Sequence, residues 1–549
     1  MIRLKKIFWA LSWSERTVFI VAFIAALISS SVLAGIAVAK STKIVPTYGG
    51  EHSEGILGQP SYINPVIAST EADKNLVRLI FSNIKDVADK IEILNDGRLW
   101  KIRLKENIRW QDGEKLTSDD VIFTVQKIQD PDSSSPLSSR WQGVAADRLS
   151  EIELQFSLAN PYAFFSDTLG TLYILPKHLF ADVPPANWHL SDYNIKPVGS
   201  GPYKFLSYEK RPDGFIYLYR LEAWDRYFEK KPFIKNFNFQ FFVRTDDLIK
   251  SFNSGQIDGI GGLEPQSLTE LKRPYETFSF ALPSYYAVFL NQSKSIPLKE
   301  LEVRRALAVA IEGENLVAEI LGGRGKVALG PIPEGTPYFN AELQKGRVPG
   351  ETAEDILDKA GWKKNNDGYR EKNIKNAVVK LELNIIVPQI NFLTKTAVLL
   401  KDAWEKAGIK TNLIIQPPEE ISRNTIKNRD YEMLLFGNVL GPSFDLFSFW
   451  HSGERFYPGL NLSLYNNKKA DSLIESIRQN LDTENRRAQF NELQMVILND
   501  QPAIFLYSPD YIYISNKDLG GPEARLIAEP ADRFVGASNW YLKTARVLK

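Results

Sequence analysis

Short runs of apolar residues with two different periods follow one another along the chain. Within Gly97–Leu104, apolar residues alternate with cations, and this period of two predicts a half-buried strand. Farther on, Thr117 precedes the pair Asp119-Asp120 and an apolar run, a pattern typical of a capped helix with carboxylates in its first turn. We expect this helix to begin near Asp119 and to end before Asp130-Pro131, because proline disfavours a helical conformation in the residue ahead of it.

The second half of the chain repeats this alternation. Val303–Glu312 and Phe392–Lys406 have helical periods, and Gly408 follows the second run at a position typical of a helix C-terminus. Apolar runs of strand length follow at Lys410–Ile415 and Tyr431–Gly437. Strands and helices in this order predict parallel βαβ units.

Thr17–Ala39 differs from these short elements, because it is an uncharged stretch of 23 residues. Eighteen of them are Ala, Val, Ile, Leu or Phe, and a helix of this length spans the hydrocarbon core of a membrane. The residues before it carry more cations than acids, so the positive-inside rule places them in the cytoplasm and the main part of the chain outside. These charged residues are Arg3, Lys5, Lys6, Arg16 and Glu15.

A cleaved signal peptide is the alternative for this stretch. Ala37-Val38-Ala39 offers a cleavage site, but the apolar region of a signal peptide normally has about 7–15 residues. A buried core helix would show a polar face, and this run has none. We therefore expect an uncleaved, single-pass anchor in a prokaryotic cell membrane, with the question of cleavage left open.

Length and composition add constraints. With 549 residues the chain exceeds the roughly 250–300 at which a single core stops growing, so several domains are expected. Its 67 Lys and Arg and 66 Asp and Glu leave a net charge of +1, which offers nucleic acid no attractive field. The absence of cysteine excludes disulfides and thiolate metal sites.

The charged stretch Lys363–Asn376 contains the turn dipeptide Asp367-Gly368 and is interpreted as a solvated hairpin loop.

Catalytic and cofactor motifs are missing from the sequence. It contains no His-Glu-x-x-His, no Gly-x-Ser-x-Gly and no phosphate-binding Gly-x4-Gly-Lys-Ser/Thr. Its four histidines are isolated, which argues against a metal site. The pairs Asp119-Asp120 and Asp246-Asp247 fit helix starts better than general acid–base work. We therefore expect a protein without enzymatic activity, cofactor or metal.

A series of short motifs along the extracytoplasmic part resembles one known family. The motifs occur in the order that is typical of the family 5 extracellular solute-binding proteins, the peptide and nickel receptors of ABC importers. They are Gly58–Pro65, Trp100-x-Ile102-x-Leu104-x5-Trp110-x-Asp112-Gly113, Leu116–Val121, Asp130-Pro131, Gly199–Tyr203, Val303–Leu307 and Ala360-Gly361-Trp362.

The resemblance implies an α/β, two-lobed, periplasmic-binding-protein-like fold with an extra domain inserted in the first lobe. Together with the N-terminal stretch, it predicts a tail and transmembrane anchor at 1–43, an inserted domain at 76–195 and a second lobe at 286–499. The first lobe would comprise 44–75, 196–285 and 500–549. The chain would cross between the lobes near Tyr285–Asn291 and Pro502–Ser508, and hinge closure around a ligand is expected.

Motif matching also implies a ligand site. The second-lobe segment Gly437–Trp450 resembles the family's ligand-facing segment, and ordinary core packing is the alternative for its aromatic residues. The predicted ligand-binding residues are Ser69, Thr70, Tyr285, Tyr286, Asn438, Phe444, Asp445, Trp450 and Tyr507.

That segment departs from the family pattern at one position. In peptide-binding members an acid there pairs with the α-amino group of the ligand, whereas this chain has Gly441-Pro442. We therefore expect an oligopeptide-like ligand that gains little from a free amino group, with Asp445 as the nearby carboxylate that could substitute.

The predicted function is a monomeric, membrane-anchored binding protein that delivers an oligopeptide-like ligand to the permease and ATPase subunits of an ABC importer. A surface sensor or hydrolase that reuses the same fold is the alternative.

Overall fold

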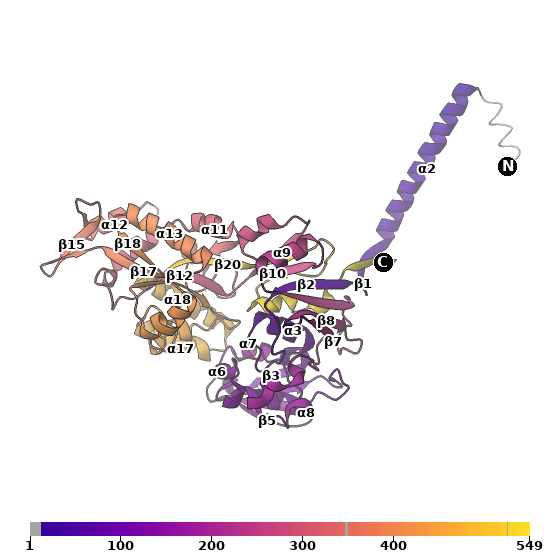
Figure 1. The fold of residues 1–549 in the computed structure, drawn as a ribbon, viewed down its shortest axis with the longest axis horizontal. Coiled ribbons are helices and arrows are strands. Elements are labelled where there is room, and N and C mark those ends of the chain that lie inside the picture. Colours follow the sequence, from indigo (N-terminus) through magenta and orange to yellow (C-terminus); the bar gives the residue numbers. More distant parts are fainter. Residues whose placement is uncertain (1–11, 346–349, 524, 549) are drawn as a thin grey trace.

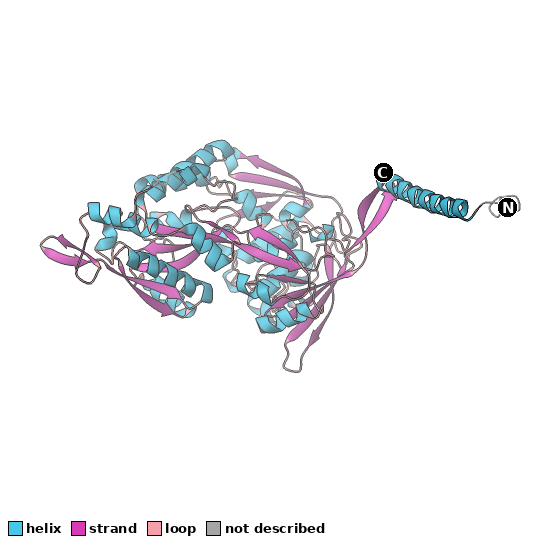
Figure 2. Cartoon of the chain, turned by 90° about the horizontal axis from the view of Figure 1, so that it is seen from above, coloured by secondary structure: helices cyan, strands magenta, loops and turns pink. Residues whose placement is uncertain are grey.

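A computed structural model describes residues 12–345, 350–523 and 525–548. Its first helix, α2 (Trp13–Ser41), is exposed along its described side chains and projects away from the rest of the chain (Figures 1 and 2). Over Trp13–Leu33, α2 is long and apolar enough to cross a membrane. The predicted helical stretch is thus confirmed as a helix. Arg3, Lys5 and Lys6 of the predicted cytoplasmic tail lie outside the described residues.

A two-stranded ribbon joins α2 to the main body. Strand β1 (Thr42–Thr47) follows α2 directly and pairs antiparallel with β21 (Lys543–Leu548), the last strand of the chain. The C-terminal strand therefore lies at the base of the apolar helix (Figure 2).

A sheet of twelve strands runs through the body (Figure 1). Strands β11 and β13 each pair with β20 beside the main path of this sheet. Along the path the order is β18 (Lys410–Gln416), β17 (Glu382–Pro388), β19 (Met433–Val439), β12 (Ser284–Leu290), β20 (Ala503–Ser515), β10 (Gly259–Gly261), β2 (Glu51–Leu57), β9 (Asn236–Phe242), β8 (Ile216–Ala223) and β7 (Tyr203–Lys210), with β11 (Glu276–Ala281) and β13 (Gly325–Val327) at its side.

Strand β20 belongs to both halves of this sheet. Its residues up to Tyr507 pair with β12, whereas those from Asp510 onward pair with β11. We call the part around β2 and β7–β11 the first lobe and the part around β12, β13 and β17–β19 the second lobe. Both predicted crossing segments are strands, but the partners change at 282–283 and 507–510, so Tyr285 lies within the second-lobe sheet instead of at the crossing.

The segment of the chain between β2 and β7 forms a separate sheet of four strands. We call the residues from Ile84 to Phe180, which carry this sheet and its helices, the inserted domain. The strand predicted after Gly97 is confirmed, and its alternating residues Trp100, Ile102 and Leu104 are buried. The sheet order is β3 (Ala88–Leu94), β4 (Leu99–Leu104), β6 (Glu153–Ser157) and β5 (Ala145–Arg148), and the helices are α4 (Ile84–Val87), α5 (Ser118–Gln129), α6 (Ser138–Trp141), α7 (Phe165–Gly170) and α8 (Lys177–Phe180).

The capped helix predicted near Asp119 is α5. Thr117 and Asp120 form a capping box at its start, and Asp130 follows its last turn. The pair Asp246-Asp247 likewise lies in the first turn of α9 (Thr245–Asn253).

Helices of the second lobe cover both faces of its sheet. Between β17 and β18, α13 completes the predicted parallel βαβ unit, and Gly408 after it has φ of 84°. The single helix expected over Val303–Glu312 ends at Val309, and another begins at Gly313. These helices are α10 (Leu301–Val309), α11 (Gly313–Leu321), α12 (Ala353–Lys359), α13 (Asn391–Lys406), α17 (Lys468–Gln479) and α18 (Thr483–Asp500).

The stretch interpreted as a solvated hairpin loop contains regular strands. Strands β14 (Lys363–Lys364) and β15 (Arg370–Ile374) flank the predicted turn, and β16 (Ala377–Lys380) adds a third strand. The hairpin is confirmed, but the loop interpretation was wrong, because cross-strand pairs order even this polar sequence.

Candidate functional site

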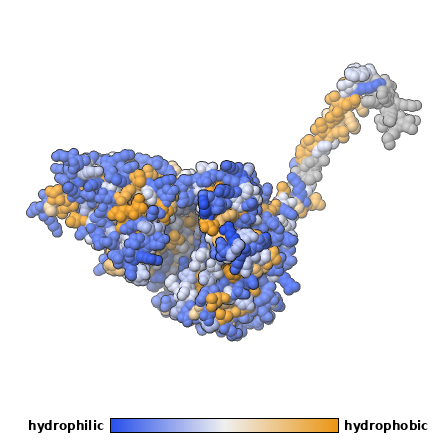
Figure 3. Space-filling model, in the orientation of Figure 1, coloured by the Kyte–Doolittle hydropathy of each residue, from blue (hydrophilic) through white to orange (hydrophobic). Residues whose placement is uncertain are grey.

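A hollow separates the second lobe from the first lobe and the inserted domain (Figure 3). The predicted site residues belong to four segments: the loop before α3 (Glu71–Ile80), strand β12, the segment from Asn438 to Trp450, and the middle of β20. Because successive strand residues point to opposite faces, neighbours such as Tyr285 and Tyr286 cannot share one surface.

Tyr285, Asn438 and Trp450 form one buried cluster. Tyr285 lies opposite Asn438 in the β12–β19 register, and its hydroxyl accepts hydrogen bonds from Asn438 Nδ2 at 2.9 Å and Trp450 Nε1 at 3.2 Å. Burial raises the pKa of Tyr285, so the hydroxyl stays neutral. Tyr285 and Trp450 have no exposed surface, so this cluster belongs to the core of the second lobe.

Tyr286 and Tyr507 lie together on the opposite face of the sheet. Their ring centroids are 5.6 Å apart, and the Tyr507 hydroxyl is 2.7 Å from Thr396 Oγ1. The Tyr286 ring covers Gly437, where a Cβ atom would come within 2.9 Å of it. Tyr286 is half-buried and Tyr507 is fully buried. The sequence-predicted tyrosines are thus divided between two faces.

Asp445 lies where the second lobe meets the inserted domain. Its carboxylate accepts hydrogen bonds from the Tyr162 hydroxyl, from Arg478 Nε and from the Phe447 amide, each at 3.0 Å. Burial and the adjacent Asp445 charge raise the pKa of Tyr162. The Asp445 carboxylate is thus already paired with the Arg478 guanidinium and accepts two further hydrogen bonds.

Phe444 lies one residue earlier in a left-handed conformation, with φ of 55°. Its ring is buried and meets Tyr338 edge-on at 6.0 Å. Core packing, the alternative considered from the sequence, describes this contact.

Ser69 and Thr70 are exposed in the loop before α3. Thr70 Oγ1 caps the helix by accepting from the Asp73 amide at 3.1 Å, and it donates to the Asp73 carboxylate at 2.7 Å. Ser135 of the inserted domain donates to the Val66 carbonyl at 2.6 Å, which fixes this loop against that domain.

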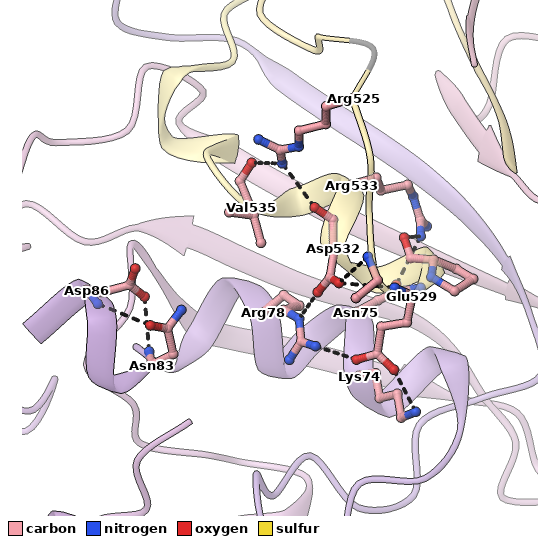
Figure 4. A network of polar contacts seen from close by, with 12 residues as sticks. Lys74, Asn75, Arg78, Asn83, Asp86, Arg525, Glu529, Asp532, Arg533 and Val535 are labelled. Atoms are coloured by element: carbon pink, nitrogen blue, oxygen red, sulfur yellow. Dashed lines mark hydrogen bonds and ion pairs between the residues drawn. The ribbon is translucent and has the colours of Figure 1, made fainter. Parts of the chain in front are cut away.

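An ion-pair network behind α3 escaped the sequence reasoning (Figure 4). Arg78 pairs with Glu529 and, at 2.7 Å, with Asp532, and Lys74 pairs with Glu529 at 2.8 Å. Burial raises the pKa of Glu529, but Arg78 and Lys74 lower it by more, so the net shift is downward. The acids lie in the segment around the short helix η10 (Pro530–Phe534). The paired residues are more than 450 positions apart in the sequence.

A second missed feature is direct contact between the inserted domain and the second lobe. The Ala163 amide donates to the Arg478 carbonyl at 2.7 Å. Phe164 is 1% exposed, with its ring 6.5 Å from Tyr338 and 6.2 Å from Phe490. Only the apolar character of Phe164 marked it in the sequence, and that does not distinguish a contact between domains from a core residue.

Comparison with known proteins identifies this architecture. The model of the bacterial extracellular solute-binding proteins, family 5 (middle region), matches residues 84–456. The chain belongs to this family. The resemblance drawn from the short motifs and the two-lobed α/β fold that it implied are thereby confirmed.

Relatives within family 5 align over most of the chain. The oligopeptide-binding protein AppA of Bacillus subtilis is 26% identical over 505 residues, covering 88% of this chain and 90% of AppA. The probable D,D-dipeptide-binding periplasmic protein DdpA of Escherichia coli is 24% identical over 492 residues, covering 86% and 87%. The crystal structure of the ABC transporter substrate-binding protein CtaP from Listeria monocytogenes has the same fold, with a TM-score of 0.75 at 23% identity and coverage of 90% and 100%.

Within the described ranges, no group of three or more His, Asp or Glu side chains is arranged to hold a metal ion.

Proposed function

We propose that this protein is the membrane-anchored receptor of an ABC importer and captures an oligopeptide-like ligand between its two lobes. It then delivers the ligand to the permease and ATPase subunits of that importer. Membership of family 5 and the peptide-binding relatives support this role. The observation that carries it is the connection between the lobes: the chain passes from one to the other at 282–283 and again at 507–510, within the single strand β20.

Two strand connections of this kind are suited to hinge closure. A ligand that contacts both lobes gains its full set of contacts only when the lobes approach each other, so binding shifts the population toward the closed form. The Tyr162–Asp445 hydrogen bond and the buried Phe164 are contacts between the inserted domain and the second lobe, and they support an approach of these two parts. The protein acts as a monomeric binding protein without enzymatic activity.

The ligand site comprises Ser69 and Thr70 on the first lobe together with the surface supported by the Tyr285 cluster. Ser69 and Thr70 are exposed, so they make direct contacts, whereas Tyr286 lies with Tyr507 on the face of the sheet opposite the Tyr285 cluster and supports the strand from there. Tyr285, Asn438, Phe444, Trp450 and Tyr507 are buried, and they hold the backbone that faces the ligand. An extended peptide bound mainly through its backbone fits this arrangement, with loose side-chain preference.

Helix α2 anchors the receptor in the cell membrane, and the lobes lie on its extracytoplasmic side. Over Trp13–Leu33 its apolar side chains are exposed among the described residues, and the hydrocarbon core of a membrane would cover them. The ribbon of β1 and β21 then places the first lobe next to the membrane.

Peptide uptake in the native cell tests this function. Cells that lack the gene should lose uptake of an isotope-labelled pentapeptide pool, and the full-length chain should restore it. Mass spectrometry of the purified full-length protein should find peptide-like molecules bound. Unchanged uptake together with an altered transcriptional response to peptides would instead indicate a sensor.

A further inference from the structure

The positively charged side chain of Arg140 lies close to the second lobe. It belongs to α6, on the side of the inserted domain that faces α17 (Figure 1). A Cβ atom built on Gly441 would lie 3.5 Å from Arg140 Nη2, so the guanidinium reaches the backbone of the opposite lobe. Gly441 has φ of 69°, a conformation that favours glycine, and this residue leaves the guanidinium uncovered by a side chain.

Acids of the neighbouring segments are already engaged. Asp445 accepts from Arg478 and Tyr162, and Glu529 accepts from Lys74 and Arg78. Arg140 adds to the field that lowers the pKa of Glu529, after burial, Arg78 and Lys74, yet it makes no ion pair with the described residues. Its side chain is exposed. The inserted domain therefore presents an exposed guanidinium, without an ion-pair partner among the described residues, beside Gly441 of the second lobe.

We propose that Arg140 anchors a carboxylate of the bound ligand beside Gly441. A guanidinium holds a carboxylate through two parallel N–H···O bonds, and closure of the lobes would strengthen the pair by excluding water. The same charge repels an ammonium group at this place. This inference rests on the proposed function and specifies its ligand as a peptide-like molecule that places an anion, not its amino group, at the Gly441 end.

The carboxylate has two sources in a peptide, the C-terminus and an acidic side chain, and four pools of random pentapeptides separate them. One pool lacks Asp and Glu and has free ends. A second is its C-amide, a third is its N-acetyl form, and a fourth is the C-amide with one Glu at varied positions. Retention by the full-length protein in nanodiscs is measured by equilibrium filtration and mass spectrometry.

The variants are Arg140→Gln, Arg140→Lys and the control Arg148→Gln, which removes an exposed arginine of β5 that pairs with Asp119. For wild type and the control, amidation should lower retention about tenfold, which corresponds to about 1.4 kcal/mol, whereas acetylation should have little effect. Recovery in the Glu-containing pool would identify a side-chain carboxylate, and no recovery would identify the C-terminus. Arg140→Gln should abolish the discrimination, and Arg140→Lys should retain part of it.

Equal retention of the free, the amidated and the Glu-containing pools by wild type would overturn the carboxylate anchor while leaving a peptide receptor in place. Discrimination that persists in Arg140→Gln would assign the anion to another residue and would also overturn it. Retention of no pool by wild type would contradict the proposed function itself.

Discussion

The two walls of the hollow are stabilised by different forces. On the first lobe, α3 is joined to the C-terminal segment by ion pairs, and behind it Arg533 and Glu54, both fully buried, form an ion pair at 3.2 Å. On the second lobe, a neutral cluster of Tyr285, Asn438 and Trp450 has the corresponding role. The charged groups around α3 should make the stability of the first lobe depend on pH, whereas the contribution of the neutral Tyr285 cluster should not.

The largest expected effect comes from the buried ion pair. Arg533→Met leaves the Glu54 carboxylate buried without its guanidinium, which should cost the first lobe about 3–5 kcal/mol. Hydrogen exchange of the β2 and β20 amides during urea titration of the full chain measures this local stability. The exposed Arg148→Met should change it by less than about 0.5 kcal/mol. Equal effects of the two variants would show that the charged network does not stabilise the first lobe.

The neutral cluster should respond less strongly to a single deletion. Tyr285→Phe removes the shared acceptor and leaves Asn438 Nδ2 and Trp450 Nε1 buried without it, at a cost of about 1–3 kcal/mol. Exchange of the β12 and β19 amides reports the change. Tyr286→Phe is the matched control on the other face of the same strand, because its hydroxyl makes no hydrogen bond to the described residues. A control variant as unstable as Tyr285→Phe would contradict the proposed role of the cluster.

The smallest expected effect is a pH dependence of stability that is confined to the first lobe. Because the pKa of Glu529 is lowered in the folded chain, its ion pairs contribute stability above its ordinary value of 4.5 and lose it as pH falls through the folded value. Wild type should exceed Glu529→Gln in first-lobe stability by about 1 kcal/mol near neutral pH, and the difference should vanish in acid. Second-lobe exchange should not distinguish the two proteins. A difference that persists after acidification would assign the effect to packing instead of charge.

The sequence predicted local features well and long-range contacts poorly. The capping box of α5 and the βαβ unit around α13 follow from residues close together in the chain. The strand character of Tyr285–Leu290 was also correct, and its alternation already implied that Tyr285 and Tyr286 face opposite sides. By contrast, the Glu529–Arg78 pair and the Arg140–Gly441 approach join segments that no local pattern connects.

Capture of a ligand by closure of the two lobes is the central claim, and a distance between the lobes tests it most directly. Because the chain has no cysteine, Lys177→Cys in α8 and Lys468→Cys in α17 give two exposed and unique sites for spin labels. Double electron–electron resonance on the full-length protein should show that the distance between the two spin labels becomes shorter when the free-ended pentapeptide pool is added. An unchanged distance, with peptide retention confirmed on the same labelled sample, would contradict capture by lobe closure.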